Sequence, residues 1–457
     1  MRKDIDMLNG PIGSSIVRFA IPVILTTMLQ SMFTTIDLVV IGQFCGSTKS
    51  AAVTSTTYLT NLLISLFTGL SLGAGLTVAR TLGTRKTEEI SGAIHTAIPT
   101  AMIGGLCLGV IGVIFAPKLL DVMDTPRNLL PLSSKYMQIY FAGIVFNIVY
   151  NFSAAIFRAV GDSKTPLFFL LISGAVRASL NLLFVAAFKF KHDIEAVAVS
   201  AVLSQATAAT LMLTALHRRT DDCKLYLKKM RIRKVHLLNI LRIGIPAGLQ
   251  ASLFSLSNVI TGTALNSFDN PALNAGNGAS ANIEAYTDAI GLGFSQTAPN
   301  FIAQNLGAKQ YDRIKKSFIT CLGLGAAIVL VTSVTMYFFG ETLLGFYLKD
   351  DQQAIHYGLI RMRYNLLLTF LCISMSICTS SLQGLGYATV ATTISLISAC
   401  GLRVLWFLTL FNLPRFHTPD GLYAINPVNW GLTVAIEATL FFVLFKKKVR
   451  KEQLSEA

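Results

Sequence analysis

Charged side chains are scarce in this sequence. They make up 13% of its 457 residues, whereas hydrophobic residues make up 53%. A soluble domain carries about 25% charged residues, so the composition excludes an ordinary soluble fold and indicates a protein that lies in a lipid bilayer. The sequence also lacks the phosphate-binding pattern GxxxxGK[ST], so ATP is not its evident source of energy.

Cysteine and histidine are few and form no pattern. The seven cysteines are odd in number, lie mostly in apolar segments and include no CxxC pair, which argues against a disulfide framework and a zinc site. The six histidines show no metal-ligand spacing. We therefore expect no cofactor and no enzymatic activity.

Apolar runs of about 20 residues, the length that crosses a bilayer, recur along the whole chain. We predict an all-α integral membrane protein with twelve transmembrane helices, at residues 14–41, 51–79, 93–116, 133–157, 166–188, 194–216, 240–266, 277–303, 317–339, 357–382, 388–411 and 427–445. The first run has no small-residue cleavage site, so we interpret it as a retained span.

Most lysines and arginines lie at the two termini and in the loops that follow even-numbered spans. Because cytoplasmic loops are rich in these residues, we predict a multi-pass protein of the cytoplasmic (inner) membrane with both termini in the cytoplasm. This topology accounts for the formal net charge of +15, so we expect no nucleic-acid partner.

The chain contains an internal repeat. Three short motifs recur at nearly the same separation: Pro22 and Pro246, Gly83 and Gly307, Gly161 and Gly386. We expect the loops around Gly83 and Gly307 and the RAVGDS turn to set cytoplasmic helix ends, where glycine permits a tight connection. Six spans return the chain to its starting side, so the repeats are parallel. We predict an N-lobe at residues 1–216, a cytoplasmic basic linker at 217–239 and a C-lobe at 240–457.

Several stretches resemble a known family. They are PVILTTMLQSMFTTIDLVVIGQF, VARTLGTRK with its echo IAQNLGAKQYDRIKK, and RAVGDSKTP. Together with two six-span repeats they are similar to the prokaryotic multidrug and toxic compound extrusion (MATE) transporters. The resemblance implies secondary active export of organic, often cationic, compounds by H⁺ or Na⁺ antiport with alternating access of two lobes. We expect small organic substrates, a lipid environment and a monomer.

The first span carries a polar stripe in which Gln30, Thr34 and Asp37 follow one another at i, i+4 and i+7. An acid inside a membrane helix costs about 2.5–3.5 kcal/mol and so indicates a partner, a proton or a function. The resemblance implies that Asp37 is a cation or proton site, with Na⁺ as one possible ion. In the alternative interpretation, Asp37 only bonds neighbouring helices.

The fifth span departs from the family pattern. Many relatives carry an asparagine followed four residues later by an aspartate, but here Asn181 is followed by Val185. Asn181 carries over as a site residue, whereas a Na⁺ site built from two carboxylates is placed in doubt. This departure favours protons.

In the second half, Glu284 and Asp288 lie one turn apart on the predicted eighth span. Two neighbouring carboxylates repel, so a shared proton, a cation or a cationic substrate would stabilise them. An interhelical structural pair is the alternative. We expect Gln250 and Asn258 on the seventh span to face the same cavity.

Other intramembrane polar residues leave two interpretations open. Tyr58 and Asn61, and Asn151 with Asn147, either line the N-lobe cavity or tie helices together. Arg177 and Arg403 are counter-ions for the acids or extend towards the outer surface, and we favour a structural role.

Two further features bear on function. GLSLG at residues 69–73 matches the nucleophile pattern GxSxG but lies mid-helix, so we interpret it as a GxxxG packing motif. A lipid-linked saccharide flippase of the same superfamily is the alternative function, although such proteins carry about fourteen spans and a basic cavity. A membrane-embedded enzyme or passive channel is disfavoured by the two-lobe repeat and the lack of catalytic motifs.

Overall fold

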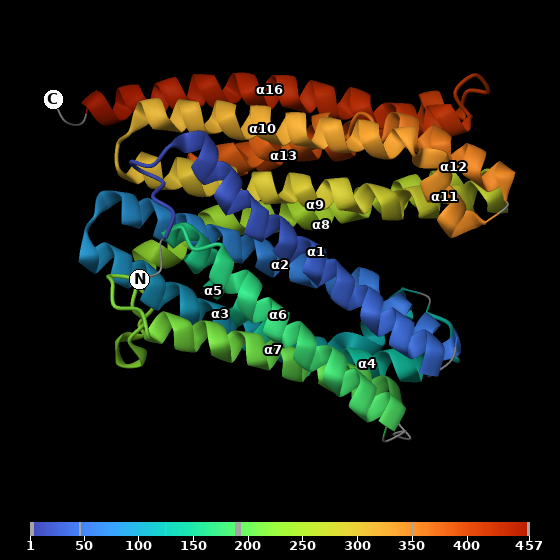
Figure 1. Cartoon of the computed structure of the whole chain (residues 1–457), viewed down its shortest axis with the longest axis horizontal. Helices are drawn as coiled ribbons and strands as arrows, with labels where there is room; N and C mark the ends of the chain where they lie inside the picture. The colour runs from blue at the N-terminus through green and yellow to red at the C-terminus, as the bar shows by residue number, and fades with distance from the viewer. Residues whose placement is uncertain (1–3, 45–46, 124, 188–192, 350, 455–457) are drawn as a thin grey trace. The chain divides into compact units, whose positions relative to one another are not determined.

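The computed structural model describes residues 4–44, 47–123, 125–187, 193–349 and 351–454, and this part of the chain contains helices and no strands (Figure 1). The α-helices are α1 (Ile12–Phe44), α2 (Ser47–Thr84), α3 (Thr87–Val122), α4 (Leu130–Ala142), α5 (Ile144–Val160), α6 (Lys164–Asn181), α7 (Asp193–His217), α8 (Lys234–Asn266), α9 (Pro271–Gly307), α10 (Tyr311–Phe338), α11 (Gly340–Leu348), α12 (Gln352–Tyr364), α13 (Thr369–Gly384), α14 (Ala388–Ser395), α15 (Arg403–Leu408) and α16 (Pro419–Leu454). The π-helices are η1 (Leu182–Ala187) and η3 (Leu396–Leu402), and the short 3-10 helices are η2 (Leu227–Lys229) and η4 (Leu410–Asn412).

Helix length and composition agree with a multi-pass membrane protein. Within the described residues, nine helices are long and apolar enough to cross a bilayer, or eleven when two bent pairs each form one span. The bent pairs are α4 with α5, at 47°, and α12 with α13, at 43°. The predicted span 277–303 lies in α9, a 37-residue helix rich in asparagine and glycine that is not among these eleven.

The helices form two compact units. Unit 1 comprises Met1–Asp6 and Leu25–Gly248, and unit 2 comprises Met7–Ile24 and Leu249–Ala457. The division therefore falls inside α1 and inside α8, in each case two residues after a proline, Pro22 or Pro246. The two prolines are equivalent in the repeat. Unit 1 therefore includes the start of α8, from the second half of the sequence, and unit 2 includes the start of α1, from the first half.

In unit 1, α2 and α8 approach through glycines. A Cβ atom on Gly69 would lie 2.1 Å from the backbone nitrogen of Gly248, and one on Gly73 would lie 2.4 Å from the carbonyl oxygen of Ile240. These distances leave no room for a side chain. The GxxxG interpretation of residues 69–73 is confirmed, and Gly244 and Gly248 supply the matching surface on α8.

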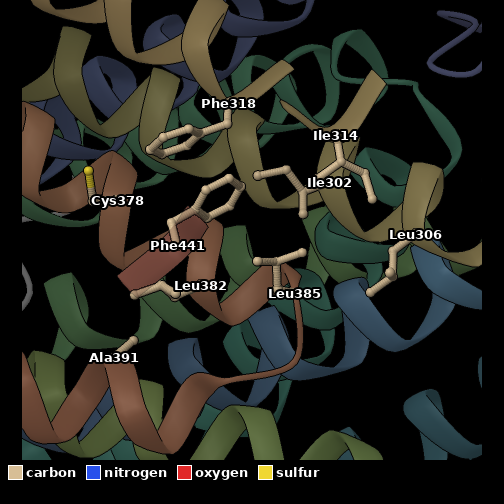
Figure 2. Close-up of a cluster of buried hydrophobic side chains, with 9 residues drawn as sticks. All are labelled: Ile302, Leu306, Ile314, Phe318, Cys378, Leu382, Leu385, Ala391 and Phe441. Carbon is tan, nitrogen blue, oxygen red and sulfur yellow. The ribbon is translucent and has the colours of Figure 1, made fainter. Parts of the chain in front are cut away.

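In unit 2, α10, α13 and α16 pack side by side (Figure 1). Their shared core includes Phe318 of α10 and Phe441 of α16, whose rings stack with centroids 3.9 Å apart (Figure 2). Phe19 of α1 joins the same unit through an edge contact with Phe301 of α9, at 5.9 Å.

The backbone repeats the register of the sequence. Gly161 and Gly386 both adopt the left-handed conformation, with φ of 98° and 90°, as expected for tight connections. α2 ends at Thr84, directly after Gly83, and α9 ends at Gly307, so both motifs lie at helix ends as expected. At these two turns the left-handed residues are Arg85 and Lys309, both with φ of 57°.

The polar segment after α7 is tied to unit 1. Arg219 contacts Asp4 at 2.6 Å and also pairs with Asp221. Partial burial acts to raise the pKa of Asp221, but hydrogen bonds and charge from Arg219 outweigh it, so the net effect is a lowered pKa. Burial raises the pKa of the neighbouring Cys223 thiol to about 12.

Candidate functional site

Asp37 of α1 lies buried in unit 1 and is held by two residues of α6. The guanidinium of Arg177 donates to both carboxylate oxygens, through Nε to Oδ1 at 3.1 Å and through Nη2 to Oδ2. Asn181 donates through Nδ2 to Oδ1 at 2.9 Å. Arg177 and Asn181 lie one turn apart, so α6 presents both donors on one face. The bidentate geometry makes Arg177 the counter-ion of Asp37.

Aromatic side chains surround this ion pair. Arg177 lies over the Phe33 ring at 6.0 Å, and Tyr136 and Tyr140 of α4 lie within electrostatic reach of both charges. The two tyrosine rings stack on each other with centroids 6.4 Å apart. The Oδ1 atom of Asn181 is buried and has no hydrogen-bond partner within the described part of the chain. The pair therefore has one vacant acceptor beside it.

The structure describes only some of the other residues predicted for this lobe. Gln30 is exposed, and it is not among the groups that hydrogen-bond Asp37 in the described residues. The side chains of Thr34, Tyr58 and Val185 lie outside the part that the structure describes.

The two predicted asparagine positions differ in their surroundings. Asn61 of α2 is exposed. Asn151 of α5 donates through Nδ2 to the side-chain oxygen of Asn147 at 3.0 Å, so the predicted i, i+4 pair bonds to itself along one helix.

Glu284 of α9 forms the second buried ion pair, in unit 2. Arg361 of α12 donates through Nε to Oε1 at 3.0 Å and through Nη2 to Oε2 at 2.6 Å. Its Nη1 donates to Asn277, which also accepts the hydroxyl of Tyr423 at 3.0 Å. Glu284 therefore forms an ion pair between α9 and α12, and Asp288, one turn further along α9, does not take part in that pair.

That carboxylate, Asp288, has a different environment. It is exposed and makes no hydrogen bond or ion pair within the described residues. Its electrostatic neighbours are Glu284 and Arg361. Because Arg361 already binds Glu284, Asp288 is the acid of this pair that has no ion-pair partner within the described residues.

Gln250 and Asn258 of α8 bond neither Glu284 nor Asp288 within the described residues. Gln250 donates to Ser395 at 3.2 Å and accepts from Gln383 at 3.2 Å. Asn258 accepts from Arg403 at 3.1 Å.

Arg403 itself is buried among neutral groups. It donates to Ser257 at 3.0 Å and to Asn426 at 3.1 Å, and it forms no ion pair within the described residues. Arg177 and Arg403 lie at nearly equivalent positions of the sequence repeat. They differ in their partners, because Arg177 binds an acid and Arg403 binds hydroxyl and amide oxygens.

Two charged residues escaped the sequence analysis. Arg361 lies near the start of the predicted span 357–382, where a basic residue looks like a loop residue. Glu437 lies in the middle of the predicted span 427–445. An acid inside an apolar run is a recognisable feature, so the sequence alone could have identified it.

A pocket of about 870 Å³ in unit 2 has the opposite charge. Its lining includes Lys309, Arg313, Lys446 and Arg450, with Asp312 as the acid. None of the predicted site residues lines it. Its basic lining suits an anionic group better than a cation.

Comparison with known proteins agrees with this architecture. The family model MatE matches the chain twice, over residues 22–183 and 246–407, which confirms the parallel internal repeat. The chain is 27% identical to the probable multidrug resistance protein YoeA of Bacillus subtilis, over 94% of this chain and 93% of that protein. It is 22% identical to the multidrug export protein MepA of Staphylococcus aureus, over 93% and 91% of the two chains.

Solved structures show the same fold. A crystal structure of a MATE protein in the straight conformation superposes with a TM-score of 0.86 over 99% of this chain and 100% of that chain, at 17% identity. The neighbours therefore support the predicted twelve-helix architecture, and the family is one of transporters rather than enzymes. The chain belongs to the MatE family and is a multi-pass MATE transporter.

Proposed function

We propose that the protein exports organic compounds in exchange for protons, with Asp37 as the coupling acid. The observation that carries this proposal is the buried carboxylate of Asp37, held by Arg177 and Asn181 between two membrane helices. Ionisable groups inside a membrane protein commonly mark ion pathways.

The ion pair supplies a mechanism. A proton that binds Asp37 removes its negative charge and so removes the Coulomb attraction to Arg177. The protonated carboxyl then becomes a donor, and the vacant Oδ1 of Asn181 offers an acceptor beside it. Proton binding would therefore change how α6 is tied to α1, which is the local change that alternating access requires.

Two observations favour protons over Na⁺ at this site. The position where relatives carry a second aspartate is Val185, so the described cluster holds one carboxylate. Arg177 already provides its positive charge, and a bound Na⁺ would have to lie next to the guanidinium. Like charges disfavour each other, whereas a proton neutralises the acid without adding a cation to the pair.

The substrate class follows from the acids and the relatives. The relatives named above are multidrug proteins, and Asp288 is exposed without an ion pair in the described residues. We propose that Asp288 binds the positive group of an organic cation, whereas Glu284 holds α9 to α12 through Arg361. Asp288→Asn should then weaken transport of cations more than transport of a neutral compound, and Asp269→Asn provides an acid-to-amide control outside this cluster.

We further propose a monomer in the cytoplasmic membrane with lobes at 1–216 and 240–457 and a cytoplasmic linker at 217–239. A thiol introduced by Lys228→Cys should then react with a membrane-impermeant reagent in inside-out vesicles. It should not react in intact cells. Labelling of intact cells would reverse the proposed orientation.

Transport is tested in inside-out vesicles with and without the protein. An acidic lumen should drive accumulation of a fluorescent organic cation, and a protonophore should abolish it. Accumulation that follows a Na⁺ gradient instead would replace the proton in this proposal. Movement of a lipid-linked saccharide without drug accumulation would support the flippase alternative.

A further inference from the structure

Unit 2 contains a buried carboxylate that the mechanism above does not use. Glu437 lies in the middle of α16 and is fully buried, with a relative exposure of 0%. Thr379 of α13 donates its hydroxyl to Oε2 at 2.7 Å, and Ser395 of α14 donates to Oε1 at 3.0 Å. Each carboxyl oxygen thus has one hydroxyl partner.

These hydroxyls belong to a longer polar chain. Gln250 of α8 donates to the Ser395 hydroxyl at 3.2 Å. The amide oxygen of Gln250 accepts from Gln383 at 3.2 Å and from Thr392 at 3.4 Å. Four helices of unit 2, α8, α13, α14 and α16, are therefore joined through one network that ends on Glu437.

No cation faces this carboxylate in the described part of the chain. Its hydrogen-bond partners are both hydroxyls, and the one titratable neighbour in electrostatic reach there is the Cys378 thiol. Cys378 of α13 belongs to an apolar cluster (Figure 2). Phe441, which lies one helical turn after Glu437 on α16, belongs to the same cluster. Glu437 thus differs from Asp37 and Glu284, each of which holds an arginine.

A buried carboxylate without a cation is costly, and protonation removes that cost. We propose that Glu437 is a proton-binding site in unit 2, distinct from Asp37. Thr379 and Ser395 can each donate or accept a hydrogen bond, so the network accommodates both forms of the acid. The role of this site in transport rests on the antiport proposed above, whereas its protonation does not.

The distances favour a proton over Na⁺. The hydroxyl oxygens lie 2.7 and 3.0 Å from the carboxyl oxygens, which is direct hydrogen-bond contact. A metal ion would have to lie between these oxygens and separate them. A proton occupies one of the existing hydrogen bonds.

The site adjoins a break in helix geometry. Ser395 is the last residue of α14, and the π-helix η3 begins at Leu396. In unit 1, Asn181 likewise ends α6, bonds the buried Asp37 and is followed by the π-helix η1. Such π-helical segments are frequent at functional sites. In both units, then, a buried acid binds the residue at which the α-helix changes form.

Infrared difference spectroscopy of the full-length protein in liposomes tests the proposal. In Asp37→Asn, raising the pH should deplete the C=O band of a protonated carboxyl. The double variant Asp37→Asn/Glu437→Gln should lose that band difference, because neither proposed proton site remains in it. A band that persists in the double variant, or one that Na⁺ displaces at constant pH in Asp37→Asn, would overturn the assignment to a proton on Glu437.

A second variant tests the same proposal if Glu437→Gln does not fold. Ser395→Ala removes the donor to Oε1 and should raise the pH at which the band is lost, because that donor stabilises the ionised form. An unchanged midpoint would contradict the proposal.

Transport measurements then separate this site from the general function. In Glu437→Gln, substrate counterflow without an ion gradient should persist, and accumulation driven by a pH gradient should fall to the level of protein-free liposomes. Gradient-driven accumulation at the wild-type level would exclude a coupling role. If the wild-type protein transports none of the compounds, the proposed antiport fails, and the infrared titration still decides whether Glu437 binds a proton.

Discussion

At the scale of single residues, the main finding is that the membrane acids have different partners. Asp37 and Glu284 each bind an arginine, and Glu437 binds two hydroxyls. The sequence was enough to single out Asp37, because an acid in an apolar run is rare. The sequence did not identify Arg177 as the partner of Asp37. That contact depends on the packing of α6 against α1, which residue spacing along the chain does not reveal.

The Asp37–Arg177 pair predicts a strong coupling between two substitutions. Arg177→Gln leaves a buried unpaired carboxylate and should destabilise the protein by about 3–5 kcal/mol, whereas Asp37→Asn/Arg177→Gln should recover much of that loss. Thermal unfolding in detergent checks the cycle. Additive losses in the double variant would mean that the pair contributes little.

At the scale of helices, close packing in unit 1 depends on two facing glycine pairs. The sequence identified the pair in GLSLG, on α2, because small residues four positions apart lie on one helix face. The partner surface on α8 was not predicted, since residues 240–248 look like part of the second half, yet they pack in unit 1. Which helix a GxxxG face meets is decided by tertiary structure.

This contact predicts opposite effects of one substitution at two positions of α8. A Cβ on Gly248 would lie 2.5 Å from the carbonyl oxygen of Leu66, so Gly248→Ala should destabilise by about 1–3 kcal/mol. Gly262 has nothing within 4 Å, so Gly262→Ala should be neutral or stabilise by up to about 1 kcal/mol. Equal melting temperatures for the two variants would contradict the packing described here.

The segment after α7 predicts a pH dependence. Asp221 has a lowered pKa in the folded protein, so its contribution is present at neutral pH and is lost as the pH falls through that lowered value. Asp221→Asn should therefore cost about 0.2–1 kcal/mol at pH 7 and nothing in strong acid. The neighbouring substitution Asp222→Asn is the control, and thermal unfolding across pH is the measurement. A cost that stays constant down to strong acid would show that the Asp221 charge is not its source.

At the scale of the whole molecule, the sequence predicts much of the architecture. Apolar runs located the spans, and the repeat of Pro22 at Pro246 located the second half, which the twofold family match confirms. The division of α1 and α8 between the compact units was not predicted, because hydropathy marks where a helix is and not what it packs against. Glu437 lies outside the stretches that resemble the family, so its charge within an apolar run is the one sequence feature that marks it.

The central claim is that Asp37 couples export to the proton gradient. Its most direct test is uptake of an organic cation into inside-out proteoliposomes with an acidic lumen, comparing wild type with Asp37→Asn/Arg177→Gln, in which no unpaired charge remains. We predict that the double variant retains counterflow and loses uptake driven by the pH gradient. Gradient-driven uptake at the wild-type rate in that variant would contradict the account.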